Sequence, residues 1–261
     1  IMKKKFKGYL RKFALKLFTL GFDPRRLLAL RFYFQFRKDK SEWLKQGGKI
    51  TSNYMILGDY SDSAGTAKGH YFHQDLLVSS LIHENDPTRH IDIASRVDGF
   101  VAHVASFREI EVVDLRPLKE SIHKNIKFLQ ADLMDPQNLG QTDSLSCLHA
   151  IEHFGLGRYT DKIDIDGHNK GISNLVNLVS NEGRLYISFP IGSKDEVHFN
   201  AHRILHPTTI LDHPSIKKYM KLLRFDYVDD DGDLHLHKDV NDVYSDMTYG
   251  CGIYTFQKIN N

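Results

Sequence analysis

The chain has 261 residues, of which 41% are hydrophobic and 26% charged, and this balance excludes disordered and fibrous proteins. The length predicts one large domain, or one domain with an appendage, that can bury a core without disulfides or metals. No apolar run reaches the roughly 20 residues that cross a bilayer. Cys147 and Cys251 do not have the spacing of a redox or metal-binding pair, so we expect a reducing, cytoplasmic location.

Charge is distributed unevenly along the chain. Residues 1–45 hold 14 Lys and Arg against 3 Asp and Glu, a net charge of +11. The whole chain carries only +2, so the remainder carries −9. Such an arm suits an anionic partner. A basic helical face docked on the acidic body explains the same asymmetry, and the sequence leaves both readings open.

Residues 1–46 are predicted to form a basic helical segment. Apolar residues recur there at helical spacing, with Lys and Arg on the other face. They are Leu10, Phe13, Ala14, Leu17 and Phe18. Asp23-Pro24 is typical of the N-cap and first position of a second helix, over 24–38. A basic amphipathic helix can lie on an anionic membrane surface or cap a neighbouring domain.

Residues 47–69 are rich in Gly, Ser and Asp and predict a connection or lid. From residue 70 to 261 we expect one domain in which strands and helices alternate, as in a parallel sheet with crossover helices. Strands are expected at 89–93, 110–114, 126–130, 144–149 and 183–188, and helices at 71–84, 100–106 and 169–179. Two final strands, at 223–228 and 252–258, have no clear helix between them and predict an antiparallel pair.

Acidic residues follow the first three strands, at the edge where an open parallel sheet binds its ligand. Asp92 ends the first strand, and the next loop has one glycine, Gly99, where a dinucleotide loop has three. Asp114 ends the second strand and can accept both hydroxyls of a ribose. Asp132 follows the third strand, where a carboxylate can accept from the amine of adenine. The fourth strand runs into His149-Ala-Ile-Glu-His153.

This series of motifs resembles the class I, Rossmann-like S-adenosylmethionine-dependent methyltransferases over roughly residues 69–261. The first loop is a variant of the family's D-x-G-x-G-x-G, with Ala94 at the first glycine. The segment 149–153 resembles H-V-L-E-H, and 179–187 resembles the entry to the fifth strand. The resemblance implies an α/β fold with a doubly wound, mostly parallel sheet and a C-terminal antiparallel hairpin.

The same resemblance implies S-adenosylmethionine as the cofactor and assigns its contacts. Residues of the first loop border the methionine part, those after the second strand the ribose, and those after the third the adenine. His149 lies near the sulfonium, and two residues before the first strand close over the cofactor. The complete set is Tyr71, Gln74, Asp92, Ala94, Ser95, Gly99, Asp114, Leu115, Asp132, Leu133 and His149.

Methyl transfer from a sulfonium is an in-line displacement that often needs a base to take a proton from the nucleophile. His is the natural base near neutral pH. We expect His153 to be this base, with His149 second, and Glu152 to orient one of them. A core or capping role for either histidine is the competing interpretation.

The loops after the fourth and fifth strands are expected to bind the acceptor, through Arg158, Tyr159, His198, His202 and Arg203. Arginine can clamp a phosphate or carboxylate. Asp164, Asp166 and His168 could bind a divalent metal. We favour an acidic loop that caps the helix near residue 169, and therefore expect no metal. The acidic run 229–233 lacks the final Glu of a calcium loop and predicts a hairpin turn.

We therefore expect a cytoplasmic methyltransferase for a small polar acceptor, with peripheral membrane contact through the basic arm and oligomerisation left open. The resemblance extends to a branch associated with bacterial surface-polysaccharide and capsule synthesis, which implies a sugar hydroxyl on an anionic, nucleotide-linked or phosphorylated sugar. N-methylation of a small amine is one alternative, with Tyr159 and Asp161 around the ammonium. A catalytically degenerate scaffold is another. The acidic body and the missing Asn/Asp-Pro-Pro-Tyr signature disfavour nucleic acid.

Overall fold

The computed structural model describes residues 24–242 and 244–260, so the predicted apolar stripe at residues 10–18 and the N-cap at Asp23 lie outside the described residues. The chain divides into two compact units, residues 1–66 and 67–261, and each is described by itself. None of the described helices is long and apolar enough to cross a membrane.

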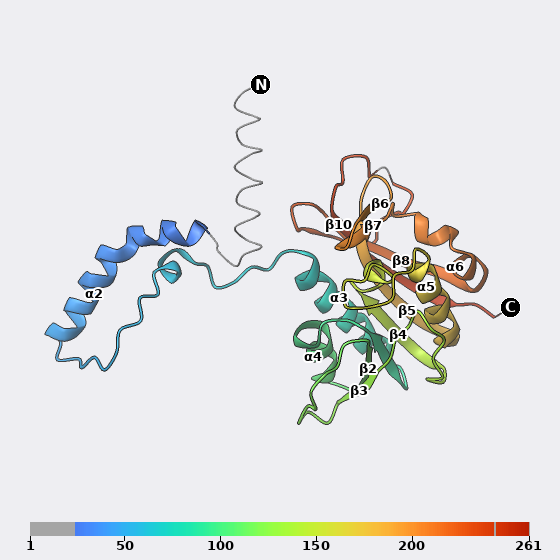
Figure 1. Cartoon of the computed structure of the whole chain (residues 1–261), viewed down its shortest axis with the longest axis horizontal. Helices are drawn as coiled ribbons and strands as arrows, with labels where there is room; N and C mark the ends of the chain where they lie inside the picture. The colour runs from blue at the N-terminus through green and yellow to red at the C-terminus, as the bar shows by residue number, and fades with distance from the viewer. Residues whose placement is uncertain (1–23, 243, 261) are drawn as a thin grey trace, which may run out of the picture. The chain divides into compact units, whose positions relative to one another are not determined.

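In the first unit, Pro24–Phe32 forms a 3-10 helix that continues into α2, Tyr33–Lys45 (Figure 1). The predicted start at Pro24 is confirmed, but the predicted end at residue 38 was wrong. The helix ends instead before Gly47, which takes φ +84°, a left-handed conformation that glycine adopts at little cost. None of the α2 side chains is buried. The connection that follows holds one further turn of 3-10 helix, Gly58–Ser61.

The second unit is built on an eight-stranded sheet with the order β3-β2-β1-β4-β5-β10-β8-β9. The strands are β1 His90–Ile93, β2 Ile110–Asp114, β3 Ile126–Gln130, β4 Thr142–Leu148, β5 Val179–Ile191, β8 Met220–Val228, β9 Leu234–His235 and β10 Gly250–Lys258. Strands β1 to β5 pair in parallel, and β10 runs antiparallel to both β5 and β8. The predicted parallel sheet with an antiparallel end is confirmed.

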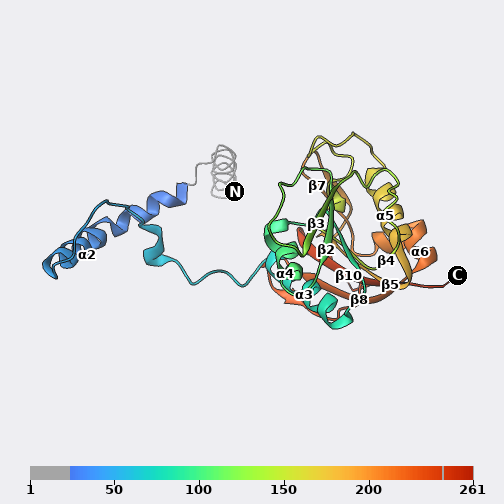
Figure 2. The same cartoon turned by 90° about the horizontal axis from the view of Figure 1, so that it is seen from below.

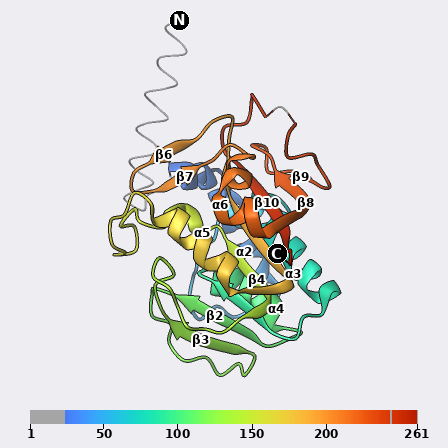
Figure 3. The same cartoon turned by 90° about the vertical axis from the view of Figure 1, so that its right-hand side faces the viewer.

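Helices cover both faces of this sheet (Figures 2 and 3). They are α3 His70–Asn85 and α4 Ala102–Ala105 on one face, and α5 Gly167–Leu178 and α6 Pro214–Tyr219 on the other. Helix α5 buries Ile172, Leu175 and Val176, which share one face at helical spacing. The helix expected at 100–106 is instead one π-helical turn, Val97–Val101, followed by α4, because Gly99 takes non-helical dihedrals.

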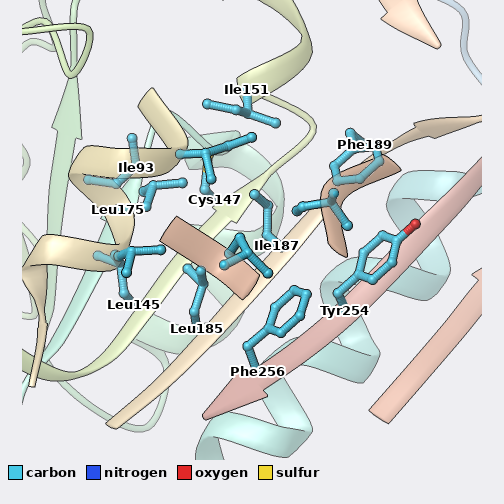
Figure 4. Packing of buried hydrophobic residues seen from close by; sticks show 14 of the residues in the cluster. Ile93, Leu145, Cys147, Ile151, Leu175, Leu185, Ile187, Phe189, Tyr254 and Phe256 are labelled. Atoms are coloured by element: carbon cyan, nitrogen blue, oxygen red, sulfur yellow. The ribbon is translucent and has the colours of Figure 1, made fainter. Parts of the chain in front are cut away.

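The larger core cluster fills the space between the sheet and α5 (Figure 4). Cys147 and Ile187 come from neighbouring strands and are completely buried, as is Leu175 of α5. Tyr254 and Phe256 of β10 extend the cluster, and the Tyr254 hydroxyl donates to the Pro207 carbonyl at 2.8 Å. Apolar side chains in continuous runs are typical of parallel strands that are buried on both faces.

Several short features were not predicted, including the 3-10 helix Ile151–His153 and three features after β5. The last three are the hairpin β6 Glu196–His198 with β7 His202–Ile204, the 3-10 helix Thr209–Asp212, and α6. Strands of three residues are too short to show an alternating pattern. The acidic run 229–233 does form the predicted turn, between β8 and β9, with the Asp229 amide donating to the Asp233 carbonyl at 3.0 Å.

The sheet order also locates the site. Strands β2 and β3 lie on one side of β1, while β4 and β5 lie on the other. The chain therefore reverses its direction of travel across the sheet at β1. In open α/β sheets, ligands bind at this point, outside the carboxyl ends of the strands.

His90 of β1 is a buried histidine that the fold holds neutral. Its Nδ1 lies 2.8 Å from the Ser144 hydroxyl, and its Nε2 lies 3.1 Å from that of Ser146. Ser146 itself donates to Asp92 at 2.6 Å, so it accepts from Nε2–H, and Nδ1 accepts from Ser144. Burial lowers the pKa of His90 from 6.5 to about 3.

This shift predicts a loss of stability in mild acid. Between pH 6.5 and 3 the unfolded chain binds a proton at His90 and the folded chain does not, so stability falls as pH drops below 6.5. Between pH 7.5 and 5.5 the wild type should lose about 1.4 kcal/mol more than His90→Gln. Urea unfolding at both pH values measures this difference. His123→Gln, at an exposed position, is the control and should follow the wild type.

Candidate functional site

Two adjoining cavities open at the carboxyl ends of β1, β2 and β4 and the loop after β3. The first encloses about 560 Å³, part of which is open to solvent. The two share Ala94, Asp114, Arg116, His149, His153 and Tyr159 as lining residues. These come from four separate segments that only the fold brings together.

Most predicted cofactor residues lie at these cavities, and some do not. The lining includes Tyr71, Ala94, Ser95, Asp114, Leu115, Asp132, Leu133, His149, His153 and Tyr159. Eight other predicted site residues line neither cavity, namely Gln74, Asp92, Gly99, Glu152, Arg158, His198, His202 and Arg203. Most of these eight residues bond to neighbouring parts of the protein and support the cavity wall.

The loop after β1 keeps a glycine-like course although its first position is alanine. Ala94 takes φ +58°, in the left-handed region, and its amide donates to the Val113 carbonyl at 2.9 Å. Asp92, expected beside the cofactor, is instead completely buried behind this loop. Its carboxylate accepts from the Ser95 amide at 3.0 Å and from the Ser95 and Ser146 hydroxyls at 2.6 Å. Asp92 therefore holds the loop in shape.

Burial raises the pKa of Asp92 to about 6, and the hydrogen bonds from the serines offset part of that effect. Gln74 and Gly99 are also structural, against expectation. Gln74 is buried, accepts from the Ser188 hydroxyl at 2.6 Å and donates to Asp75 at 3.0 Å. A Cβ on Gly99 would lie 2.6 Å from Oδ2 of Asp75, so a larger residue there would displace the Asp75 side chain.

Asp114 points to the cavities from the end of β2 and is paired with Arg116. The Arg116 Nη2 lies 2.6 Å from Asp114 Oδ2, and its backbone amide donates to Oδ1 at 2.8 Å. The Arg116 guanidinium also lies 4.5 Å from the ring centre of Tyr159. A cation and an aromatic ring thus lie beside Asp114 in the lining of both cavities. The sequence signal for Arg116 was its place two residues after the acidic strand end.

Asp132 and Leu133 line the first cavity in the loop after β3. Asp132 Oδ1 accepts from the Met134 amide at 2.9 Å, which fixes the turn, and Leu133 is almost fully buried. Met134 also lines this cavity and was not predicted. Carboxylate and apolar side chains next to each other can bind the amine and the flat face of a purine ring.

His149 and Glu152 form a buried pair at the end of β4. His149 Nδ1 lies 2.8 Å from Glu152 Oε1, and both residues are over 90% buried. Burial raises the pKa of Glu152, but the neighbouring His149 imidazole outweighs that effect and holds the pKa below its ordinary value. The ionised carboxylate therefore holds a proton on Nδ1 of His149. Burial lowers the pKa of His149, but Cys251 and Glu152 outweigh that effect and raise it well above its ordinary value. Glu152 does not reach the cavity and acts through the histidines.

His153 lies on the cavity wall with one nitrogen held by the backbone. Its Nδ1 donates to the Ala201 carbonyl at 2.7 Å, which leaves Nε2 as the acceptor. Burial lowers the pKa of His153 below its ordinary value, with Arg158 acting in the same direction and Glu152 opposing both. Nε2 lies 3.4 Å from Arg158 Nη1 and 3.6 Å from Glu152 Oε1. A neutral imidazole with an acceptor nitrogen is the state that a general base requires.

The predicted acceptor residues are dispersed. Arg158 donates to the Ala201 carbonyl at 2.8 Å, and Tyr159 alone of this group lines the cavities. Arg203 is buried and donates to the Phe154 carbonyl at 2.7 Å, so it anchors the backbone and is not placed as an anion clamp. His198 and His202 face each other across the β6–β7 hairpin, with ring centres 5.2 Å apart.

The carboxylates of the acidic loop 161–168 bond to groups of the loop itself and of helix α5. Asp164 pairs with Lys170 and accepts from the Asp166 amide at 2.9 Å. Asp166 accepts from the Asn169 side chain at 2.7 Å, at the start of α5. The carboxylates thus organise the entry to the helix. Asp161, which lines the first cavity, accepts from the backbone amides of its own loop.

Comparison with protein families gives a match to part of the chain. A family model described as "Caenorhabditis protein of unknown function, DUF268" matches residues 134–228, well under half of the chain. No curated protein matches the sequence.

Solved structures match over most of the chain. The 1,6-didemethyltoxoflavin-N1-methyltransferase of Burkholderia thailandensis, with bound 1,6-didemethyltoxoflavin and S-adenosylhomocysteine, aligns with a TM-score of 0.50 and 12% identity over 88% of this chain and 90% of its own. The methyltransferase domain of bacterial CtHen1 aligns at 0.50 and 14%, over 71% and 97%. Residues 67–261 have the class I methyltransferase fold.

The fold alone does not fix the reaction. The [4+2]-cyclase SpnF aligns as well as the methyltransferases do, with a TM-score of 0.51 and 12% identity over 76% of this chain and 86% of its own. Sites within one fold host different chemistries. The activity of this chain therefore depends on the residues that line its own cavities.

Proposed function

We propose that the chain transfers a methyl group from S-adenosylmethionine to a small polar acceptor. The observation that carries this proposal is the convergence of Asp114, Asp132 and His153 on one cavity at the switch point of the sheet. The two carboxylates are spaced along the strand ends to meet the ribose and the adenine amine. The histidine lies beyond them, where the methyl group would be presented.

In the proposed reaction the acceptor's heteroatom attacks the methyl carbon as the carbon–sulfur bond breaks. S-adenosylhomocysteine leaves with the electron pair of that bond. Nε2 of His153 takes the proton that the acceptor loses, because Nδ1 is held by the Ala201 carbonyl. The cavity walls fix the line of nucleophile, methyl and sulfur, and this alignment supplies much of the rate.

A sugar hydroxyl in surface-polysaccharide synthesis is our first choice of acceptor. A hydroxyl must lose a proton, which gives a function to a neutral histidine at the cavity. Arg116 beside Tyr159 is paired with Asp114, and a phosphorylated or nucleotide-linked sugar would share this cation, in place of the buried Arg203. An ammonium acceptor is less well served, because the Asp161 carboxylate is already engaged by the amides of Gly155, Gly157 and Tyr159.

Cofactor binding is the first test, by calorimetric titration with S-adenosylmethionine and S-adenosylhomocysteine. Asp114→Asn should weaken both by about 10-fold, because charge-assisted hydrogen bonds to the ribose are lost. Glu120→Gln, an exposed acidic residue that lines neither cavity, should bind as the wild type does. If the wild type binds neither compound, the proposal fails.

The acceptor is tested by incubation with methyl-labelled S-adenosylmethionine and two panels, one of free and phosphorylated sugars and one of small amines. Mass spectrometry of the products locates the methyl group. An O-methylated sugar supports the proposal. Transfer to amines alone would replace the sugar by the N-methylation alternative, and cofactor binding without transfer to either panel would favour the scaffold.

A further inference from the structure

A second cluster of reactive side chains adjoins the cavity wall at His149. One ligand atom each from His70, His149 and Cys251 lies within 4.8 Å of the other two. They come from the start of α3, the end of β4 and the start of β10, so their spacing in the sequence gave no metal-binding motif.

The nitrogen of His149 that faces this cluster lacks a partner. Nδ1 is taken by Glu152 at 2.8 Å, so the free atom is Nε2. Nε2 is buried and makes no hydrogen bond within the described part of the chain. The whole His149 residue is only 9% exposed. A buried nitrogen without a partner is costly in a folded protein and calls for a ligand at that position.

The surroundings of His149 match those of a metal-ligating histidine. Such histidines usually donate the second ring nitrogen to a carboxylate, which fixes the tautomer and aims the first nitrogen at the metal. Glu152 provides that carboxylate, completely buried beside His149. The His70 and His149 rings are stacked with their centres 5.2 Å apart. Tyr249 also stacks on His70, with ring centres 5.2 Å apart. The rings are therefore held in place from several sides.

From this geometry we propose that His70, His149 and Cys251 form a binding site for a divalent transition metal ion of the zinc class. Two imidazoles and a thiolate exclude magnesium and calcium, which prefer oxygen. Zinc bonds are about 2.0–2.1 Å to nitrogen and 2.3 Å to sulfur, so binding draws the three atoms somewhat closer together. Cys251 releases its thiol proton when the metal–sulfur bond forms. Three protein ligands leave a fourth position for water or another donor.

Cobalt(II) alone is the probe for this site. The purified full chain is treated with a chelator, dialysed and titrated with cobalt chloride, while absorption is recorded in the near-ultraviolet thiolate-to-cobalt charge-transfer region. One equivalent should produce this band, and zinc added afterwards should abolish it. Cys251→Ser should lose the band. Cys147→Ser, the matched control with its thiol in the apolar core (Figure 4), should keep it.

Zinc affinity by calorimetry adds a test that does not depend on sulfur. His70→Ala, at a half-buried helix start, should weaken zinc by at least about 100-fold, and Glu152→Gln by about 10- to 100-fold. Circular dichroism checks that each variant is folded. No charge-transfer band in the wild type, or a band that persists in Cys251→Ser, would overturn the site. Since no titration involves S-adenosylmethionine, this result is independent of the proposed methyl transfer.

Discussion

His153→Ala should lower turnover by about 100-fold or more while leaving the affinity for S-adenosylmethionine within about two-fold of the wild type. The imidazole lines the cavity, but its proton is fixed on Nδ1 by the Ala201 carbonyl, so its contribution is to accept a proton through Nε2. Turnover is measured as release of S-adenosylhomocysteine with an active acceptor, and cofactor affinity by calorimetry.

The pH dependence distinguishes a base from a packing residue. Burial lowers the pKa of His153, so the wild-type rate should fall only when pH drops below the ordinary imidazole value of about 6.5. His153→Ala should lack this acid limb. His123→Ala, on an exposed loop, should keep both rate and limb. Full turnover in His153→Ala would exclude His153 as the base.

The fold could be predicted in detail where short strands lie between turn residues. Strands β2 and β3 have the predicted ends, although β2 buries three residues and the edge strand β3 buries none. The exceptions have local causes. Gly99 breaks the helix after β1, and Glu182, with φ +63°, lets β5 begin at Val179 instead of at residue 183. Hairpin β6–β7 depends on tertiary packing that no short-range pattern contains.

The candidate site was predictable by position but less so by role. The strand ends placed Asp114, Asp132 and His153 at one cavity, because parallel strands finish at one edge of the sheet. The roles of the other predicted site residues depend on their hydrogen-bond partners, which the sequence does not reveal. Asp92 binds two serines, and Arg203 binds backbone carbonyls, so both support the wall. Cys251 joins His149 only because β10 returns to the middle of the sheet.

Gly155 fixes the course of the loop that carries Tyr159. Gly155 takes φ +77°, and its carbonyl accepts from the Asp164 amide at 3.0 Å, which closes the loop over residues 155–164. A Cβ at this position would lie only 2.0 Å from the Asp164 carbonyl oxygen, which is backbone and cannot rotate away. Gly155→Ala should therefore combine left-handed strain with a collision that opens the loop.

We expect Gly155→Ala to destabilise the fold by about 3 kcal/mol or more, and thermal unfolding should show the midpoint lowered by about 6–12 °C. Gly140→Ala separates the two contributions, because Gly140 has a similar φ of +70° but only an ordinary contact, 3.5 Å from Arg89. It should cost about 1–2 kcal/mol from backbone strain alone. Equal midpoints for the two variants would show that the loop yields without cost. A larger loss in Gly155→Ala, together with reduced turnover and retained cofactor affinity, would show that the closed loop shapes the acceptor side of the cavity.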